Sequence, residues 1–108
     1  MNQNLEKKNH YNFLYSYYQE LLTQKQRDVF ESYYFQDYSL SEIAEELNVS
    51  RNAIWDLLKK VEVNLDDYEK KLGLYQKSLE TSKLYDDLEK HLDNEGIIIL
   101  NQIREMEW

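Results

Sequence analysis

The 108-residue sequence contains no cysteine and no proline, and its only glycines are Gly73 and Gly96. The absence of cysteine excludes disulfides and thiolate metal sites, and it favours a reducing cytoplasmic location over a secreted one. Two isolated glycines cannot build the glycine-rich loops that cradle nucleotide phosphates. The longest apolar run, Ile97 to Leu100, is far too short to span a membrane, and the N-terminus lacks the apolar core of a signal peptide. We therefore expect a soluble cytoplasmic protein without membrane insertion.

Side chains suited to catalysis are also few. His10 and His91 are the only candidates for a general base at neutral pH, and no motif surrounds either of them. The pairs Asp66-Asp67 and Asp86-Asp87 have the carboxylates that magnesium prefers, but adjacent residues of a helix point in different directions. Solvated acidic faces are far commoner than magnesium sites. The sequence predicts a non-enzymatic protein with no catalytic residue, no metal and no cofactor.

Basic residues are outnumbered by acidic ones: the chain has 13 Lys and Arg and 21 Asp and Glu, which gives a net charge of −8. Such a balance opposes avid binding to a polyanion. The excess is uneven: residues 1–60 hold seven basic and nine acidic side chains, whereas residues 61–108 hold six and twelve. Most of the acid thus lies outside the first half of the chain.

What the chain does contain favours helices. Leu, Glu, Lys and Gln fill the intervals, and ten tyrosines suit half-buried helix faces and interfaces. We predict an all-α fold with helices over 5–22, from Thr23 to about Gln36, a short one after Ser39, and a long one from Ser50 to Leu72. Thr23 with Gln26, and Ser39 with Glu42, form capping boxes. The residues expected to face inward are Tyr11, Leu14, Tyr18, Leu21, Leu22, Val29, Phe30, Tyr33, Ile43, Ala44, Leu47, Ile54, Leu57, Leu58 and Val61.

The C-terminal third is expected to form an acidic helical extension. Apolar residues at steps of three and four continue across Gly73, which either ends the long helix or weakens it, and resemble a coiled-coil seam. The seam is Leu65, Tyr68, Leu72, Tyr75 and Leu79, and it shifts to Tyr85, Leu88 and Leu92. Asn94-Glu95-Gly96 is interpreted as a helix C-terminus, followed by a short helix with Ile99, Leu100, Ile103 and Met106 inward. We predict a domain over residues 1–72 and an extension over 73–108, packed on the first domain or in a dimer interface.

Residues 40–57 satisfy the spacing of a helix-turn-helix. Ala44 supplies the small residue where the helices cross, Asn48 tolerates a left-handed turn, and Val49 is expected to plug that turn. The outward face of the second helix would enter the major groove, where Arg51 suits guanine, Asn52 suits adenine and a lysine suits a phosphate. The predicted DNA-binding residues, including capped helix starts and nearby cations, are Thr23, Lys25, Arg27, Ser39, Ser50, Arg51, Asn52, Trp55, Asp56, Lys59 and Lys60.

These residues carry a family resemblance. Leu22 to Phe30, Tyr33-Tyr34 and Tyr38 to Ile54 resemble region four of bacterial sigma factors. The stretch from Tyr11 to Leu72, about two thirds of the chain, resembles more closely the YlxM family of small helix-turn-helix proteins of Gram-positive bacteria and mycoplasmas. The resemblance implies a sigma-region-four-like (winged-helix-like) fold, a homodimer, DNA binding and a regulatory link to the signal recognition particle pathway.

Three functional hypotheses remain open. The first is a DNA-binding regulator with weak, salt-dependent affinity for duplex. The second is an adaptor that keeps the fold but binds protein or structured RNA, because Trp55 replaces a polar reader and Asp56, Glu62, Asp66 and Asp67 interrupt the basic face. The third is that the acidic extension folds over the basic residues and restrains them.

Overall fold

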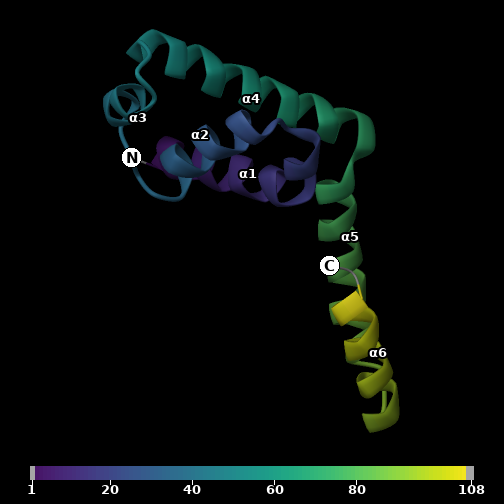
Figure 1. The fold of residues 1–108 in the computed structure, drawn as a ribbon. Helices are drawn as coiled ribbons and strands as arrows, with labels where there is room; N and C mark the ends of the chain where they lie inside the picture. The colour runs from purple at the N-terminus through teal and green to yellow at the C-terminus, as the bar shows by residue number, and fades with distance from the viewer. Residues whose placement is uncertain (1, 107–108) are drawn as a thin grey trace. The chain divides into compact units, whose positions relative to one another are not determined.

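The computed structural model describes residues 2–106, with side chains described from residue 5 onward. Its elements are α1 (Asn2–Tyr18), the 3-10 turn η1 (Gln19–Leu21), α2 (Gln24–Tyr34), α3 (Leu40–Leu47), α4 (Arg51–Leu72), α5 (Leu74–Glu89) and α6 (Asn94–Met106) (Figure 1). No strand occurs in this range, so the all-α prediction is confirmed. Contacts divide the chain into an N-terminal unit, Met1–Tyr75, and a C-terminal unit, Gln76–Trp108.

Each of the three predicted N-caps starts a helix. The Thr23 hydroxyl accepts from the backbone N–H of Gln26 at 3.1 Å, and the Ser39 hydroxyl accepts from that of Glu42 at 3.0 Å. In both cases the third-position side chain accepts a bond from the cap residue's own N–H, completing a capping box. The Ser50 hydroxyl accepts from the N–H of Ala53 and begins α4. Local hydrogen bonding therefore fixes where α2, α3 and α4 begin.

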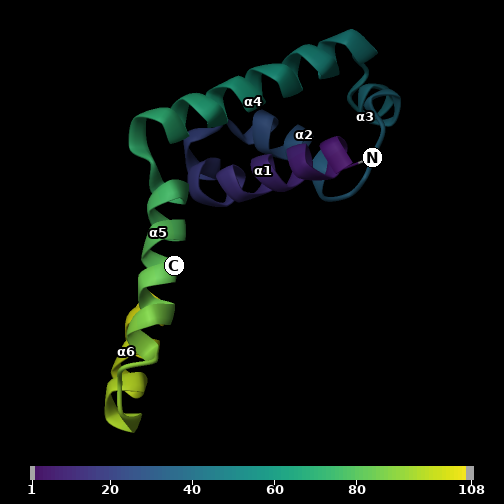
Figure 2. The same cartoon turned by 180° about the vertical axis from the view of Figure 1, so that it is seen from behind.

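Helix α4 packs against three other helices of the N-terminal unit, α1, α2 and α3. Figures 1 and 2 show α1 and α2 running side by side with α4 along them. The core gathers aliphatic and aromatic side chains from these four helices and from Leu22, which follows η1: Leu14, Tyr15, Tyr18, Leu22, Val29, Phe30, Tyr34, Leu40, Ile43, Ala44, Ile54, Leu58, Val61 and Leu65. Helical spacing predicted most of this set.

Among the residues up to Val61 that were predicted to lie inward, Leu21 and Leu47 are exposed, and so is Val49, which was expected to plug the turn. Leu21 faces solvent because α1 ends at Tyr18 and the tighter turn η1 shifts the phase, whereas Leu22 is buried as predicted. Leu47 and Val49, on either side of the left-handed residue Asn48, are 44% and 40% exposed. The backbone closes that turn: the Val49 N–H donates to the Ala44 carbonyl at 3.0 Å. The Val49 side chain, which was expected to plug the turn, is thus only partly covered.

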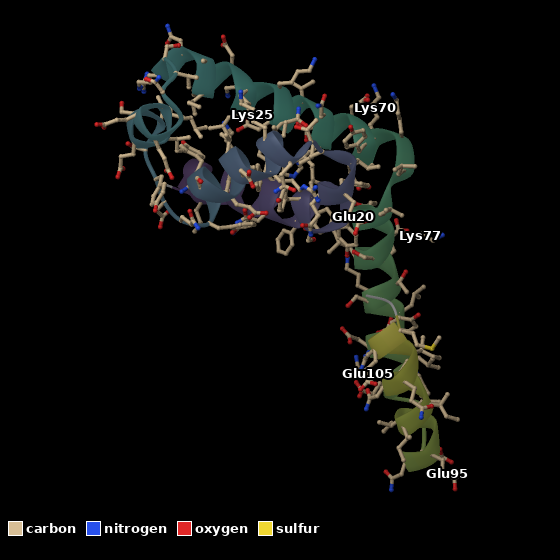
Figure 3. The ribbon with its side chains drawn as sticks, viewed as in Figure 1. Glu20, Lys25, Lys70, Lys77, Glu95 and Glu105 are labelled. Carbon is tan, nitrogen blue, oxygen red and sulfur yellow. The ribbon has the colours of Figure 1, made fainter. Side chains whose placement is uncertain are left out.

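In the C-terminal unit, α5 and α6 are joined by a short connection, and Arg104 on α6 pairs with Asp86 and Glu89 on α5. The prediction of a helix end at residues 94–96 is wrong, because α6 begins there. The Asp93 carboxylate accepts from the Gly96 N–H at 2.8 Å, so this glycine lies in a capped first turn. Figure 3 labels Glu95 and Glu105 near the two ends of α6.

The predicted coiled-coil seam is interrupted. Gly73 adopts a left-handed conformation with φ 63°, ends α4, and is followed directly by α5. Leu65 is buried and Tyr68 and Tyr75 pack on the N-terminal core, whereas Leu72 and Leu79 are exposed. Among the apolar residues expected inside the last helix, only Leu100 is buried. None of the helices in residues 2–106 is both long and apolar enough to cross a membrane.

Candidate nucleic-acid interface

The candidate interface begins at the turn between α3 and α4. Asn48 adopts φ 56° and ψ 46°, a left-handed conformation that asparagine tolerates better than most residues, and its N–H donates to the carbonyls of Ala44 and Glu45. Ser50 then caps α4, so the second helix starts two residues after the turn. The backbone thus presents the first turns of α4 at a defined angle to α3, as a helix-turn-helix requires.

The side chains at the start of α4 form what we call the α4 face: Arg51, Asn52, Trp55, Asp56, Lys59 and Lys60. All are exposed except Lys59, which is half-buried. Its ammonium lies 4.4 Å from the centre of the Trp55 ring, which is itself 46% exposed. This is a cation–π arrangement that keeps the indole and the ammonium together. The prediction that these residues share a helix agrees with the structure.

Glu62 is not on this face, although the sequence placed it among the acids that interrupt the basic residues. It is only 7% exposed, and one of its oxygens accepts the Tyr34 hydroxyl. Its other oxygen, Oε1, lies 3.4 Å from Nζ of Lys7 on α1 and 3.4 Å from Nζ of Lys59. The buried carboxylate is therefore neutralised inside the fold and opposes a phosphate less than its formal charge suggests.

Other carboxylates of the N-terminal unit accept tyrosine hydroxyls in the same way. Tyr11 donates to Asp66 at 2.7 Å, Tyr18 donates to Glu69 at 2.6 Å, and Tyr15 donates to Glu31. Asp66 also pairs with His10 at 2.9 Å. These bonds join α1 to α4 and to α2, so much of the acid of this unit serves to hold helices together.

Burial raises the pKa of each of these tyrosines, and the hydrogen bond to a carboxylate raises it further. For Tyr18, burial is again the largest cause, followed by the bond to Glu69, and together they raise the pKa to about 12. The hydroxyls therefore stay protonated donors at neutral pH.

The remaining predicted contacts lie on other helices. The Thr23 and Ser39 hydroxyls are occupied by their capping bonds, which leaves the earlier amides of each first turn for an anion. Lys25 is exposed near the start of α2, and Figure 3 labels it. Arg27 is half-buried and donates to Gln24 at 3.1 Å, which makes it a weaker candidate than the sequence indicated.

Sequence reasoning missed the internal network of Lys7, Tyr34 and Glu62. One signal was available: Ile54, Leu58 and Glu62 recur at steps of four, so the glutamate continues the buried stripe of α4. Charge patterning alone had placed it outside. Among the described side chains, no cluster of His, Cys, Asp and Glu has the arrangement of a metal site.

Comparison with known proteins agrees with this geometry. A family model described as "Putative helix-turn-helix protein, YlxM / p13 like" matches residues 5–104, well beyond the two thirds that carried the resemblance. A UPF0122 protein of Listeria innocua is 48% identical over 93 residues, covering 86% of this chain and 84% of the relative. One from Anoxybacillus flavithermus is 51% identical over 88 residues, covering 82% and 80%. One from Streptococcus thermophilus is 46% identical over 104 residues, covering 92% and 94%. The chain therefore belongs to the family of YlxM/p13-like helix-turn-helix proteins.

Proposed function

We propose that this protein is a non-enzymatic regulator that binds duplex DNA weakly through the α4 face. The observation that carries the proposal is the exposed first half of α4, which follows a left-handed turn and a serine cap. A helix presented in this way fits the major groove, and Arg51 and Asn52 have the donor geometry for guanine and adenine edges. Membership of a helix-turn-helix family supports the same reading.

The internal pairing of acidic residues supports the proposal further. A net charge of −8 overstates the repulsion near α4, because the buried Glu62 carboxylate is engaged by the Tyr34 hydroxyl and by two lysines. At the surface, Asp66 accepts the Tyr11 hydroxyl and pairs with His10. Few cations remain for phosphates, however. Affinity should therefore be modest and should fall steeply as salt rises.

The test is a fluorescence anisotropy titration of labelled random duplex at several low salt concentrations. The double variant Arg51→Ala/Lys60→Ala removes two exposed cations without disturbing the Glu62 pairs. We expect it to weaken binding by about 1–3 kcal/mol and to reduce the salt slope by about one. Lys59 is left intact because its loss would also affect Trp55 and Glu62.

The matched control is Lys77→Ala/Lys83→Ala, which removes the same charge from exposed positions of the C-terminal unit. Helical circular dichroism should be unchanged in both variants. If both lose affinity equally, only net charge matters and the α4 face is not the interface. A wild-type chain that fails to bind duplex at the lowest salt would exclude the function altogether.

A second candidate is an adaptor that binds protein or structured RNA. Two large apolar side chains of α4, Trp55 and Val63, are exposed, and an exposed indole is a common anchor in interfaces. Under this reading, a selection from random RNA and from duplex at low salt enriches RNA, or neither. Trp55→Ala would then abolish retention of the enriched RNA, or of the protein partner in a pull-down, whereas Leu72→Ala, which removes another exposed apolar side chain of α4, would not.

The proposal includes the regulatory connection with the signal recognition particle pathway that the family resemblance implies. It predicts that deleting the gene for this chain changes the abundance of the particle's protein or of its receptor. Unchanged abundance of both would remove the regulatory part and leave DNA binding to be judged on its own titration.

A further inference from the structure

The buried carboxylate of Glu62 carries one negative charge but lies beside two positively charged ammonium groups. Two ammonium groups, those of Lys7 and Lys59, approach the same oxygen at 3.4 Å, and the Tyr34 hydroxyl bonds the other oxygen. Lys7 comes from α1 and Lys59 from α4, one turn before the glutamate. A single buried carboxylate is neutralised by one cation, so one of the two lysines can leave without stranding a charge.

The two lysines differ in what else they reach. Nζ of Lys59 lies over the ring of Trp55, in the middle of the α4 face. Lys7 lies on α1, on a different element from that face. Lys59 is therefore the lysine that can swing towards a phosphate, and Lys7 is the one that can stay with Glu62.

We propose that Lys7 is a positioning residue for nucleic-acid binding, which acts through Glu62 to release Lys59 from the fold to a backbone phosphate. This rests on the proposed function of the α4 face. With Lys7 present, Glu62 keeps one ammonium and the Tyr34 hydroxyl after Lys59 departs. Without Lys7, the departure of Lys59 leaves a buried carboxylate unpaired, which is strongly unfavourable, so Lys59 stays inside.

The test compares Lys7→Met with Lys8→Met. The two lysines are neighbours on α1 and carry the same charge, but Lys8 pairs with Asp37 at 3.2 Å and not with Glu62. In the duplex titration, Lys7→Met should lower the magnitude of the salt slope by about 0.9, the loss of one phosphate contact. Lys8→Met should leave the slope at the wild-type value. Lys7→Arg should restore it, because arginine keeps a cation beside the carboxylate.

A double-mutant cycle separates this route from a general effect of charge. Glu62→Gln keeps an acceptor for Tyr34 but removes the charge that holds Lys59, so Lys7→Met should have no further effect on the slope in that background. Thermal melts of every variant identify any that fail to fold. Equal slopes for Lys7→Met and Lys8→Met, or a full Lys7→Met effect that persists with Glu62→Gln, would overturn the inference.

A readout without DNA distinguishes failure of this inference from failure of the proposed function. The chain has two tryptophans, so Trp108→Phe leaves Trp55 as the only indole. In that background, Glu62→Gln should shift the emission of the free protein, because Lys59 is no longer held over the ring, while Lys8→Met should not. Wild-type protein that binds no duplex refutes the proposed function and with it the role of Lys7 in binding, whereas a shifted emission would still show that Glu62 holds Lys59. An unchanged Trp55 emission with Glu62→Gln refutes the linkage itself.

Discussion

At the scale of single residues, the structure shows why tyrosine is so frequent in this chain. The abundance of tyrosine predicted half-buried helix faces. In the structure, four of the hydroxyls have the same role, those of Tyr11, Tyr15, Tyr18 and Tyr34. Each donates to a carboxylate on another helix. A buried acceptor that loses its donor retains the full cost of desolvation, so these bonds constrain the packing of helices as well as stabilise it.

Alkaline pH should therefore destabilise the fold. The pKa of Tyr18 is raised from 10.0 to about 12 by burial and by the bond to Glu69. Below pH 10 the hydroxyl is protonated in both states and its contribution is complete. Between pH 10 and 12 the unfolded chain ionises while the folded chain resists, so the free energy of unfolding falls as pH rises.

Urea unfolding at several pH values between 9 and 12 measures this fall. Tyr18→Phe should reduce its slope, since one raised pKa is removed, whereas Tyr38→Phe, at an exposed site, should preserve it. Slopes that are identical in the wild type and Tyr18→Phe would contradict the assignment.

At the scale of helices, local signals located the starts of α2, α3 and α4 but not the end of α1 or the start of α6. The caps at Thr23, Ser39 and Ser50 could be predicted because one side chain bonds an amide three residues away. The end of α1 and the start of α6 depend on a 3-10 turn and on Asp93, whose effects short-range patterns do not resolve. The four-residue spacing of α4 indicated burial of Glu62, but its partners on α1 and α2 could not be predicted because they are distant in sequence.

The α3 cap gives a direct test at this scale. Ser39→Ala should lower the free energy of unfolding by about 1 kcal/mol, because it leaves the Glu42 N–H without its acceptor. Ser41→Ala changes the same residue type two positions later, at an exposed site inside α3, and should be neutral or slightly stabilising. Denaturant melts that rank the two variants in the opposite order would show that the capping box does not stabilise the helix-turn-helix.

For the whole molecule, the C-terminal unit differs from the N-terminal unit in how little it buries. Leu100 is its one buried apolar residue among those described, while Leu84 is 67% and Ile98 is 60% exposed. Exposed apolar surface of this kind is commonly covered by another chain. The homodimer expected from the family resemblance therefore remains our prediction, with α5 and α6 supplying its interface.

Sedimentation equilibrium over a range of protein concentrations checks this prediction. Ile98→Ser/Ile99→Ser should shift the mass towards the monomer and lower the melting temperature at high concentration. Gln102→Ala, an exposed polar position on the same helix, should leave the mass unchanged. A wild-type chain that is monomeric throughout would contradict the dimer.

The junction at Gly73 has a consequence for how this chain tolerates change. One residue separates α4 from α5, and the next two amides are already occupied: Leu74 donates to the Tyr18 hydroxyl at 3.0 Å and Tyr75 to the Glu69 carboxylate at 3.1 Å. Because both amides are bonded, we expect the backbone at this junction to resist proteolysis. An inserted residue would separate both N–H donors from their acceptors. Length variation among relatives should accordingly avoid residues 73–75 and accumulate elsewhere, as at the exposed turn between α2 and α3.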